Sequence, residues 1–188
     1  MLLSDAVPTE HGPVATRRVI AADGGAVEVT VSAMAEMIGG AVTLREAQWD
    51  GRPLDGKLAV IAAPDDAWQP TSDGPDWGPP FADAYFTGPR AFLDAGARVE
   101  AQVAWLRDNE SDLLATTPSN LAAIVEHLGT NNTALPRLRY VRTSGRPAAQ
   151  QLHRASADLW GARLHDGYVD PILGAIAYPC PEIGRAHV

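Results

Sequence analysis

The sequence is poor in lysine and cysteine. Of its 15 basic residues 14 are arginine, and Lys57 is the only lysine. A reaction that needs a catalytic lysine therefore has a single candidate. Cys180 is the only cysteine, which excludes an internal disulfide framework and is typical of proteins in a reducing cytoplasm.

Long apolar runs and clustered positive charge are also missing. The first residues contain no basic segment followed by an apolar one, and no apolar run approaches the roughly 18 residues that span a bilayer. We therefore expect a cytoplasmic protein without a membrane partner. The formal net charge is −8 and the arginines are scattered, so we expect no nucleic-acid partner, because phosphate binding needs clustered positive charge.

The composition is that of one globular domain. A chain of 188 residues, 46% hydrophobic and 20% charged, is long enough to bury a sizeable core. Residues 1–16 contain Pro8, Gly12 and Pro13 and show no periodicity, which predicts an extended N-terminal arm. We expect residues 17–188 to form a single α/β domain.

A β-hairpin and a helix are predicted near the N-terminus. The strand-like runs 17–21 and 26–30 surround the turn signal Asp23-Gly24-Gly25. Ser32 then offers a helix cap, and apolar residues at near-helical spacing continue the helix to about Trp49. We expect this apolar stripe to pack in the core, as methionine-containing stripes usually do. Its members are Met34, Met37, Ile38, Val42 and Leu44.

The rest of the chain alternates strands and helices. Strands are predicted at residues 57–63, 113–116, 138–145, 162–170 and 174–178, and helices at residues 99–108, 119–128 and 147–160. Ser119 is expected to cap the second of these helices, and Gly129 is expected to end it. The alternation predicts a three-layer α/β fold with a mostly parallel sheet flanked by helices.

The best candidate site lies in the βαβ unit of residues 138–170. Pro147 and Gly161 mark the ends of a helix between its two strands, which are therefore expected to be parallel. The carboxyl ends of both strands then open on one edge of the sheet, where α/β folds bind their ligands. The polar residues at that edge are Thr143, Ser144, Arg146, His165, Asp166, Tyr168 and Asp170.

Three of these residues are candidate catalytic groups, and each also has a structural interpretation. Asp170 is the preferred acid–base group, although capping of the turn at Pro171 explains it equally well. His165 can be a general base held by carboxylates, or a hydrogen-bonded histidine without a catalytic role. Asp166 can take part in catalysis or cap a loop, and as the strand neighbour of His165 it must point to the opposite face.

The remaining candidates would bind substrate. They are Thr143, Ser144, Arg146, Tyr168, Trp68 and Trp77. Ser144 can instead start the following helix, and the two tryptophans can either roof the site or fix a proline-rich loop. Cys180 and His187 are too few for a structural zinc site, which normally has four ligands. We expect no metal and no cofactor.

Several short segments occur in an order typical of one enzyme superfamily. They are residues 103–106, 112–121, 138–141, 160–163 and 176–182. In this series the chain resembles the acyl-adenylating, or AMP-binding, enzymes and most of all the phenylacetate–CoA ligase group. The resemblance covers about residues 17–188, and its strength lies in the colinear order of the segments.

The resemblance implies that the ATP machinery of these enzymes is lost here. Their phosphate loop, Ser-Gly-Ser-Thr-Gly, corresponds to Ile-Ala-Ala-Asp-Gly-Gly at residues 20–25, which has no hydroxyl group. Their Tyr-x-x-(Thr/Glu)-Glu motif corresponds to residues 168–172, where Tyr168 remains and Ile172 replaces the magnesium-binding glutamate. The first third of the family and its C-terminal domain, which holds the catalytic lysine, have no counterpart. We therefore expect the middle part of such an enzyme, without ATP-dependent ligase activity.

Three kinds of function remain open. The preferred one is a small protein of a biosynthetic pathway that keeps a pocket for an acyl or aryl carboxylic acid derivative. The alternative is a repurposed hydrolase, cyclase or lyase that acts on an acyl substrate without ATP, and a third is a scaffold for a partner protein. Because the relatives pack this region against another subdomain, we expect an exposed apolar face here and a symmetric homodimer.

Overall fold

The computed structural model describes residues 7–20, 25–64, 71–131, 134–145, 147–170, 174–180 and 184–187. Within these ranges, the side chains of Ile20, Asp170, Pro179 and Cys180 and of residues 174–175 and 184–187 are not described. Four residues named above, Trp68, Arg146, Pro171 and Ile172, lie outside the described residues, as do Asp23 and Gly24 of the predicted hairpin turn.

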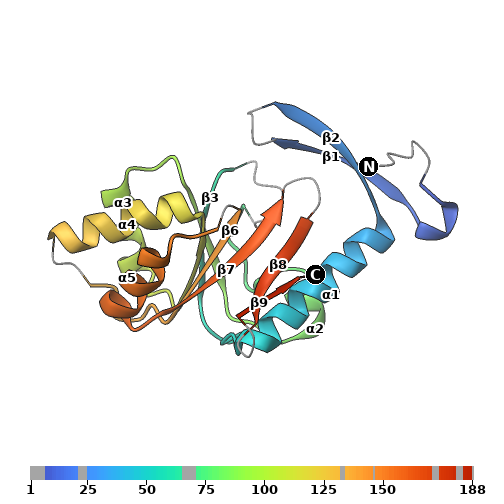
Figure 1. Cartoon of the computed structure of the whole chain (residues 1–188). Coiled ribbons are helices and arrows are strands. Elements are labelled where there is room, and N and C mark those ends of the chain that lie inside the picture. The colour runs from blue at the N-terminus through green and yellow to red at the C-terminus, as the bar shows by residue number, and fades with distance from the viewer. Residues whose placement is uncertain are drawn as a thin grey trace.

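The described part of the chain contains one seven-stranded sheet with the strand order β4-β3-β5-β6-β7-β8-β9 (Figure 1). The strands are β3 (Leu58–Ala62), β4 (Arg90–Asp94), β5 (Leu113–Thr116), β6 (Tyr140–Gly145), β7 (Arg163–Asp170), β8 (Gly174–Cys180) and β9 (Gly184–His187). Neighbouring strands are parallel from β4 to β7, and β8 and β9 are antiparallel. The predicted α/β fold class and the parallel pairing within the βαβ unit are confirmed.

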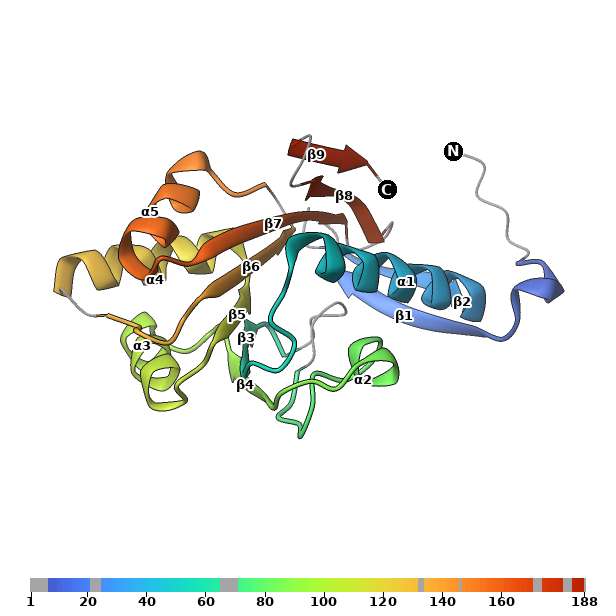
Figure 2. The ribbon, with the colours of Figure 1, turned by 90° about the horizontal axis from the view of Figure 1, so that it is seen from below.

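Helices lie on both faces of this sheet (Figure 2). They are α1 (Ala33–Asp50), α2 (Phe81–Ala84), α3 (Val99–Asp108), α4 (Pro118–Asn131) and α5 (Gln150–Trp160). Helices α3, α4 and α5 cover one face, which we call the leucine face, and the C-terminal part of α1 covers the other, the charged face. In the described residues, no helix has the length and hydropathy to span a membrane.

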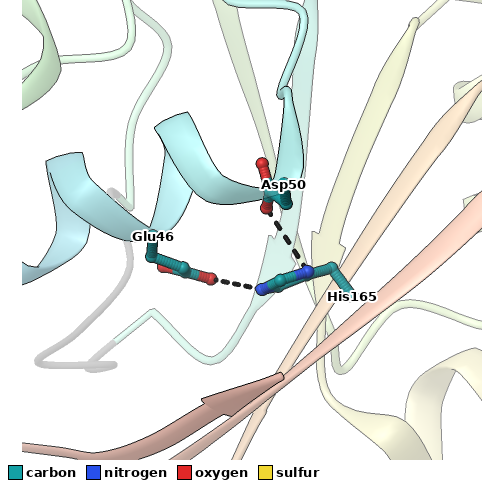
Figure 3. A group of neighbouring side chains, drawn as sticks. All are labelled: Glu46, Asp50 and His165. Atoms are coloured by element: carbon teal, nitrogen blue, oxygen red, sulfur yellow. Dashed lines mark ion pairs between the residues drawn. The ribbon is translucent and has the colours of Figure 1, made fainter. Parts of the chain in front are cut away.

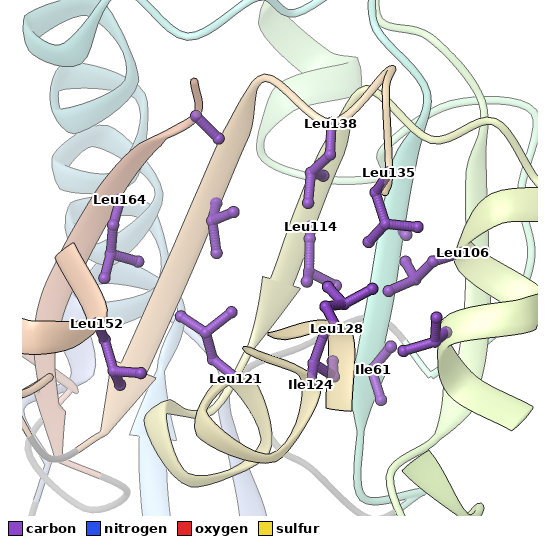
Figure 4. Packing of buried hydrophobic residues seen from close by; sticks show 14 residues of the cluster. Ile61, Leu106, Leu114, Leu121, Ile124, Leu128, Leu135, Leu138, Leu152 and Leu164 are labelled. Atoms are coloured by element: carbon purple, nitrogen blue, oxygen red, sulfur yellow. The ribbon is translucent and has the colours of Figure 1, made fainter. Parts of the chain in front are cut away.

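The leucine face holds the main hydrophobic core (Figure 4). The apolar residues of α4 at i, i+3 and i+7 point at the sheet, where Leu121, Ile124 and Leu128 are fully buried. They pack over strand residues such as Ile61 and Leu114, which are also fully buried. The continuous apolar runs predicted a sheet covered on both faces, and this prediction is confirmed for β3 and β5.

Helix α4 begins and ends differently from the prediction. It starts at Pro118, and the cap is Thr117, whose Oγ1 accepts a hydrogen bond from the backbone N–H of Asn120 at 3.3 Å. Ser119 therefore lies inside the helix, where its hydroxyl contacts that of Thr117. Gly129 does not end the helix, because its φ is not positive and the last turn continues to Asn131.

Besides the short 3-10 helix at residues 9–11, three elements were not predicted. Strand β4 is a short run at the edge of the sheet, and the bridge between Gly74 and Arg90 holds it to the preceding loop. The one-turn helix α2 follows directly from the proline-rich loop, and β9 adds a last antiparallel strand. All three are too short to show a period, so the sequence gives little local signal for them.

A second sheet consists of the predicted hairpin, which projects from the body of the molecule beside α1 (Figure 1). Its strands are β1 (Val14–Ile20) and β2 (Ala26–Ser32), which pair in antiparallel register, and a short 3-10 helix, η1 (Thr9–His11), precedes them. The first strand thus starts three residues earlier than predicted. Ser32 caps α1 as expected, since its Oγ accepts from the N–H of Ala35 at 3.3 Å.

The predicted packing of the α1 stripe is wrong for two residues. Met37 is 68% exposed and Ile38 is 55% exposed. The part of α1 that is buried against the sheet lies further on, and it buries Glu46, Ala47 and Asp50. The helix therefore uses its C-terminal half to hold the fold and leaves the apolar N-terminal half open.

Candidate functional site

The predicted site residues divide between the two faces of the sheet. Alternation along β6 and β7 places Thr143 and Asp166 on the leucine face, beside the start of α5. The Thr143 hydroxyl donates to Asp166 Oδ1 at 2.7 Å, and the N–H of Ala148 donates to Asp166 Oδ2 at 2.7 Å. Thr143 is fully buried. Asp166 thus ties the β6–α5 loop to the sheet, which is the loop-capping role that the sequence left open.

His165 lies on the charged face, where two carboxylates of α1 surround it (Figure 3). Its Nε2 is 3.1 Å from Glu46 Oε1, and its Nδ1 is 3.4 Å from Asp50 Oδ2. The ring is only 3% exposed. The Nε2 contact lacks hydrogen-bond geometry, so in the described structure this nitrogen has no hydrogen-bond partner. The predicted opposite orientation of His165 and Asp166 is confirmed.

Two arginines neutralise the same carboxylates. Arg142 donates to Glu46 through Nε at 3.2 Å and through Nη2 at 3.4 Å, which is a two-point contact. Arg52 Nη2 lies 3.1 Å from Glu46 Oε1 and 3.0 Å from Asp50 Oδ2. The side chains of Glu46 and Asp50 are 1% and 0% exposed, so both carboxylates depend on these partners.

The charges of the cluster perturb its pKa values strongly. Burial alone would raise the pKa of Glu46, but the charge of Arg142 and the contacts with His165 and Arg52 hold it well below its usual range. Burial raises the pKa of the Tyr140 phenol far above its usual value, and Asp50, which accepts a hydrogen bond from this hydroxyl, raises it further. Burial would lower the pKa of Arg142, but Glu46 raises it. Glu46 therefore stays ionised as the partner of fixed arginine charges.

Glu46, Asp50 and His165 also have the spacing of a metal site, but their surroundings do not suit a cation. Ligand atoms of the three residues lie within 4.8 Å of one another. However, Arg52 and Arg142 already occupy the same carboxylate oxygens. A divalent ion would be buried beside two positive guanidinium groups, at a large electrostatic cost. The cluster is better described as an ion-pair network.

An open cleft of about 1100 Å³ lies next to this network, and we call it the α1 cleft. It runs between the hairpin, the N-terminal half of α1, α2 and the charged face of the sheet. Its walls are mainly apolar, and its floor includes Arg52, Tyr140, Arg142 and Tyr178. The apolar wall residues include Val29, Val31, Met37, Ile38, Leu58 and Phe81.

The arginines separate the buried carboxylates from the α1 cleft. Arg52 and Arg142 line the cleft, whereas Glu46 and Asp50 do not. The ion pairs are therefore oriented with their positive ends toward the opening. The outer fork of Arg142, formed by Nη1 and Nη2, lies beside the ring of Tyr178, 6.0 Å from Cζ to the ring centroid.

The other predicted site residues have different positions. Ser144 and Trp77 line the α1 cleft, but Trp77 is only 2% exposed and its Nε1 donates to the Gly56 carbonyl at 3.1 Å. Tyr168 is 44% exposed. Asp170 ends β7 opposite Gly174, but its side chain is not described.

Cys180 and His187, which the sequence analysis considered too few for a zinc site, are only partly described. The register places Cys180 opposite Gly184 and His187 opposite Ala177, and the side chains of both are not described. Trp68 and Arg146 lie outside the described residues altogether.

The sequence reasoning named His165 but missed the other residues of the charged network. Glu46 and Asp50 are four positions apart and so lie on one helix face, which was a readable signal. Their partners Arg52, Arg142 and His165 are scattered over more than a hundred residues, and no spacing connects them. The charge of Arg142 was visible in β6, but a strand arginine is usually read as a solvent-facing residue.

Comparison with known proteins agrees with the fold. No protein-family model matches the sequence, and comparison with curated proteins finds no relative. Solved structures do match: the anthranilate CoA ligase AuaEII in complex with anthranoyl-AMP has a TM-score of 0.66 and 13% identity, over 89% of this chain and 31% of that chain. The 2-hydroxyisobutyryl-CoA ligase in its postadenylation state has a TM-score of 0.64 and 14% identity, over 93% of this chain and 36% of that chain. The acyl-CoA synthetase of Brucella canis has a TM-score of 0.61 and 19% identity, over 88% of this chain and 29% of that chain.

The chain has the fold of one part of the acyl-CoA ligases. It spans about a third of the length of these structures. The resemblance to adenylating enzymes is thus confirmed for the fold.

Proposed function

We propose that this protein binds an acyl or aryl carboxylic acid derivative in the α1 cleft, within a small biosynthetic pathway and without ATP-dependent ligase activity. The observation that carries the proposal is the cleft itself, which is large, mainly apolar and provided with a few convergent polar groups. The ligands of two structural neighbours, anthranoyl-AMP and R3-HIB-AMP, belong to those proteins and only suggest the class of acid.

The geometry supports an assignment of the two ends of the ligand. The apolar part would lie against Met37 and Ile38, whose exposure to water is otherwise unfavourable. The polar end would accept hydrogen bonds from the outer fork of Arg142, because Glu46 uses only the Nε and Nη2 side. Tyr178 lies beside this fork, and Gly167 makes room for it, since a Cβ on Gly167 would lie 2.8 Å from Tyr178 Cε1.

The absence of ligase activity is proposed from the sequence. Residues 20–25 carry no hydroxyl group for a triphosphate, and Ile172 cannot bind magnesium. An ATP-independent role is therefore the simplest use of the remaining cleft, and no cofactor is required for it.

Calorimetry with a matched probe set tests the binding proposal. Decanoate and benzoate should bind, and decanol and decylamine should bind more weakly, because only the acids offer Arg142 a negative charge and two acceptor oxygens. Carboxylate-dependent pyrophosphate exchange from ATP and magnesium should be absent. Binding of none of the acids, or clear pyrophosphate exchange, would refute the proposed function.

A catalytic version of this function has one observation in its favour. Val169 lines the α1 cleft, and the next residue is Asp170, the preferred acid–base group of the sequence analysis. A hydrolase, cyclase or lyase reaction on an acyl substrate would then use Asp170, with Tyr168 and Ser144 as binding groups. Single Asp170→Asn and Tyr168→Phe variants should retain the fold by circular dichroism and lose turnover. Full turnover in both variants would remove this site.

Two further proposals concern the setting of the protein. The exposed Val14 and Val27 of the hairpin support the proposed homodimer, since a monomer leaves them in water. We also propose a cytoplasmic location, which agrees with the single cysteine.

A further inference from the structure

The outer edge of β2 is open in the described part of the chain. Strand β2 pairs only with β1, so its other edge has no strand partner. Ala26, Val27, Glu28 and Thr30 are exposed. An isolated two-stranded hairpin is marginally stable in water, and an open edge presents backbone groups to another strand.

The sequence of β2 suits pairing with a second copy of itself. The middle residue of Ala26–Ser32 is Val29, so a two-fold axis at Val29 gives antiparallel pairing along the full strand. Val29 then faces Val29 of the other copy, and Val27 faces Val31. The only charged residue, Glu28, faces Thr30. β-branched pairs of this kind are favourable across strands, and no like charges meet.

The outer edge of β1 does not suit such pairing. The middle residue of Val14–Ile20 is Arg17, which would face Arg17 of the other copy. Its neighbour Arg18 would face Thr16, so each copy adds a second positive charge close by. Like charges directly opposite are unfavourable, which makes β2 the edge that pairs.

We propose that two copies of this chain associate through antiparallel pairing of their β2 strands, centred on Val29, to form one four-stranded sheet. The hairpin face that contains Val19, Val27, Val29 and Val31, with Arg17 opposite Val29, becomes continuous across the two-fold axis. This proposal rests on the homodimer proposed above and names its interface, and it depends on the hairpin edge and not on any ligand in the α1 cleft.

Site-directed crosslinking of the full chain tests the register. In a Cys180→Ser background, Val29→Cys should form an intermolecular disulfide rapidly under mild oxidation, because residues opposite each other in a sheet have Cβ atoms about 5 Å apart. Thr16→Cys on β1 is the matched control and should remain uncrosslinked at the same concentration. Equal crosslinking of both variants, or none at Val29→Cys, would overturn the register.

Charges introduced at Val29 test the pairing. Mixing two variants of opposite charge separates a loss of pairing from misfolding of either variant. By light scattering the wild type should have twice the chain mass of 19.9 kDa at micromolar concentration. Val29→Lys and Val29→Glu should each be monomeric, because like charges then meet at the axis, and a mixture of the two should restore the dimer. The control Thr16→Lys should stay dimeric. A monomeric wild type, or a Val29→Lys variant that remains dimeric, would refute the proposal.

Discussion

The two faces of the central sheet are stabilised in different ways. The leucine face is a dry, close-packed layer in which α3, α4 and α5 bury aliphatic side chains. The charged face buries Glu46, Asp50, Arg52 and His165 under α1 and then opens into the α1 cleft. Buried charges contribute little net stability unless every partner is present, whereas aliphatic packing contributes by area and volume. The leucine face therefore holds the fold, and the charged face is the one available for binding.

The charged face should be the more sensitive to the loss of a single charge. Glu46→Gln keeps the shape but leaves Arg142 and Arg52 with one carboxylate between them. We expect a loss of about 3–5 kcal/mol in the free energy of unfolding, measured by urea denaturation. Glu36→Gln, which removes the exposed pair with Arg17, is the control and should cost less than about 1 kcal/mol. Similar losses in the two variants would show that the buried network contributes no more than an exposed ion pair.

The leucine face should respond to loss of volume. Leu128→Ala removes a fully buried side chain of α4, and we expect a loss of about 3 kcal/mol. Leu159→Ala, on α5 and 38% exposed, is the matched control with an expected loss below about 1 kcal/mol. Thermal and urea unfolding of both variants measure the difference. A loss at Leu128 no larger than at Leu159 would show that this face is not the packed core.

Acid should weaken the charged face more than the leucine face. The pKa of Glu46 is lower in the folded protein than its ordinary value of 4.5, so its contribution is complete above that value and is lost as the pH falls below it. We expect wild type to lose on the order of 2 kcal/mol more than Glu46→Gln between pH 6 and pH 3. Urea titrations across this range measure it. Parallel pH profiles would mean that Glu46 does not control the acid response.

The smallest expected effect concerns the loop between β6 and α5. Asp166→Asn removes the charge from two short hydrogen bonds on the leucine side, at a cost of about 1–2 kcal/mol. Asp158→Asn, exposed on α5, should leave the stability unchanged. If Asp166→Asn abolished turnover while the stability stayed at the wild-type value, the residue would have to be considered catalytic after all.

Much of the fold was determined by the sequence alone. A short apolar run gave β5 its bounds, helical spacing placed α3, and turn and helix-end residues placed the hairpin and the βαβ unit, because these signals are local. Alternation within β7 also required His165 and Asp166 to point to opposite faces. The short edge strand β4 escaped prediction, because it carries no periodic signal of its own.

The character of the charged face was decided only by the tertiary structure. Glu46 and Asp50 belong to α1, Arg142 to β6 and His165 to β7, and their contacts depend on how the helix crosses the sheet. The sequence could not show that Met37 and Ile38 remain open to water, because helical periodicity predicts an apolar face without saying what covers it. Charges and uncovered surfaces are matters of long-range geometry, whereas strands and helices are matters of local pattern.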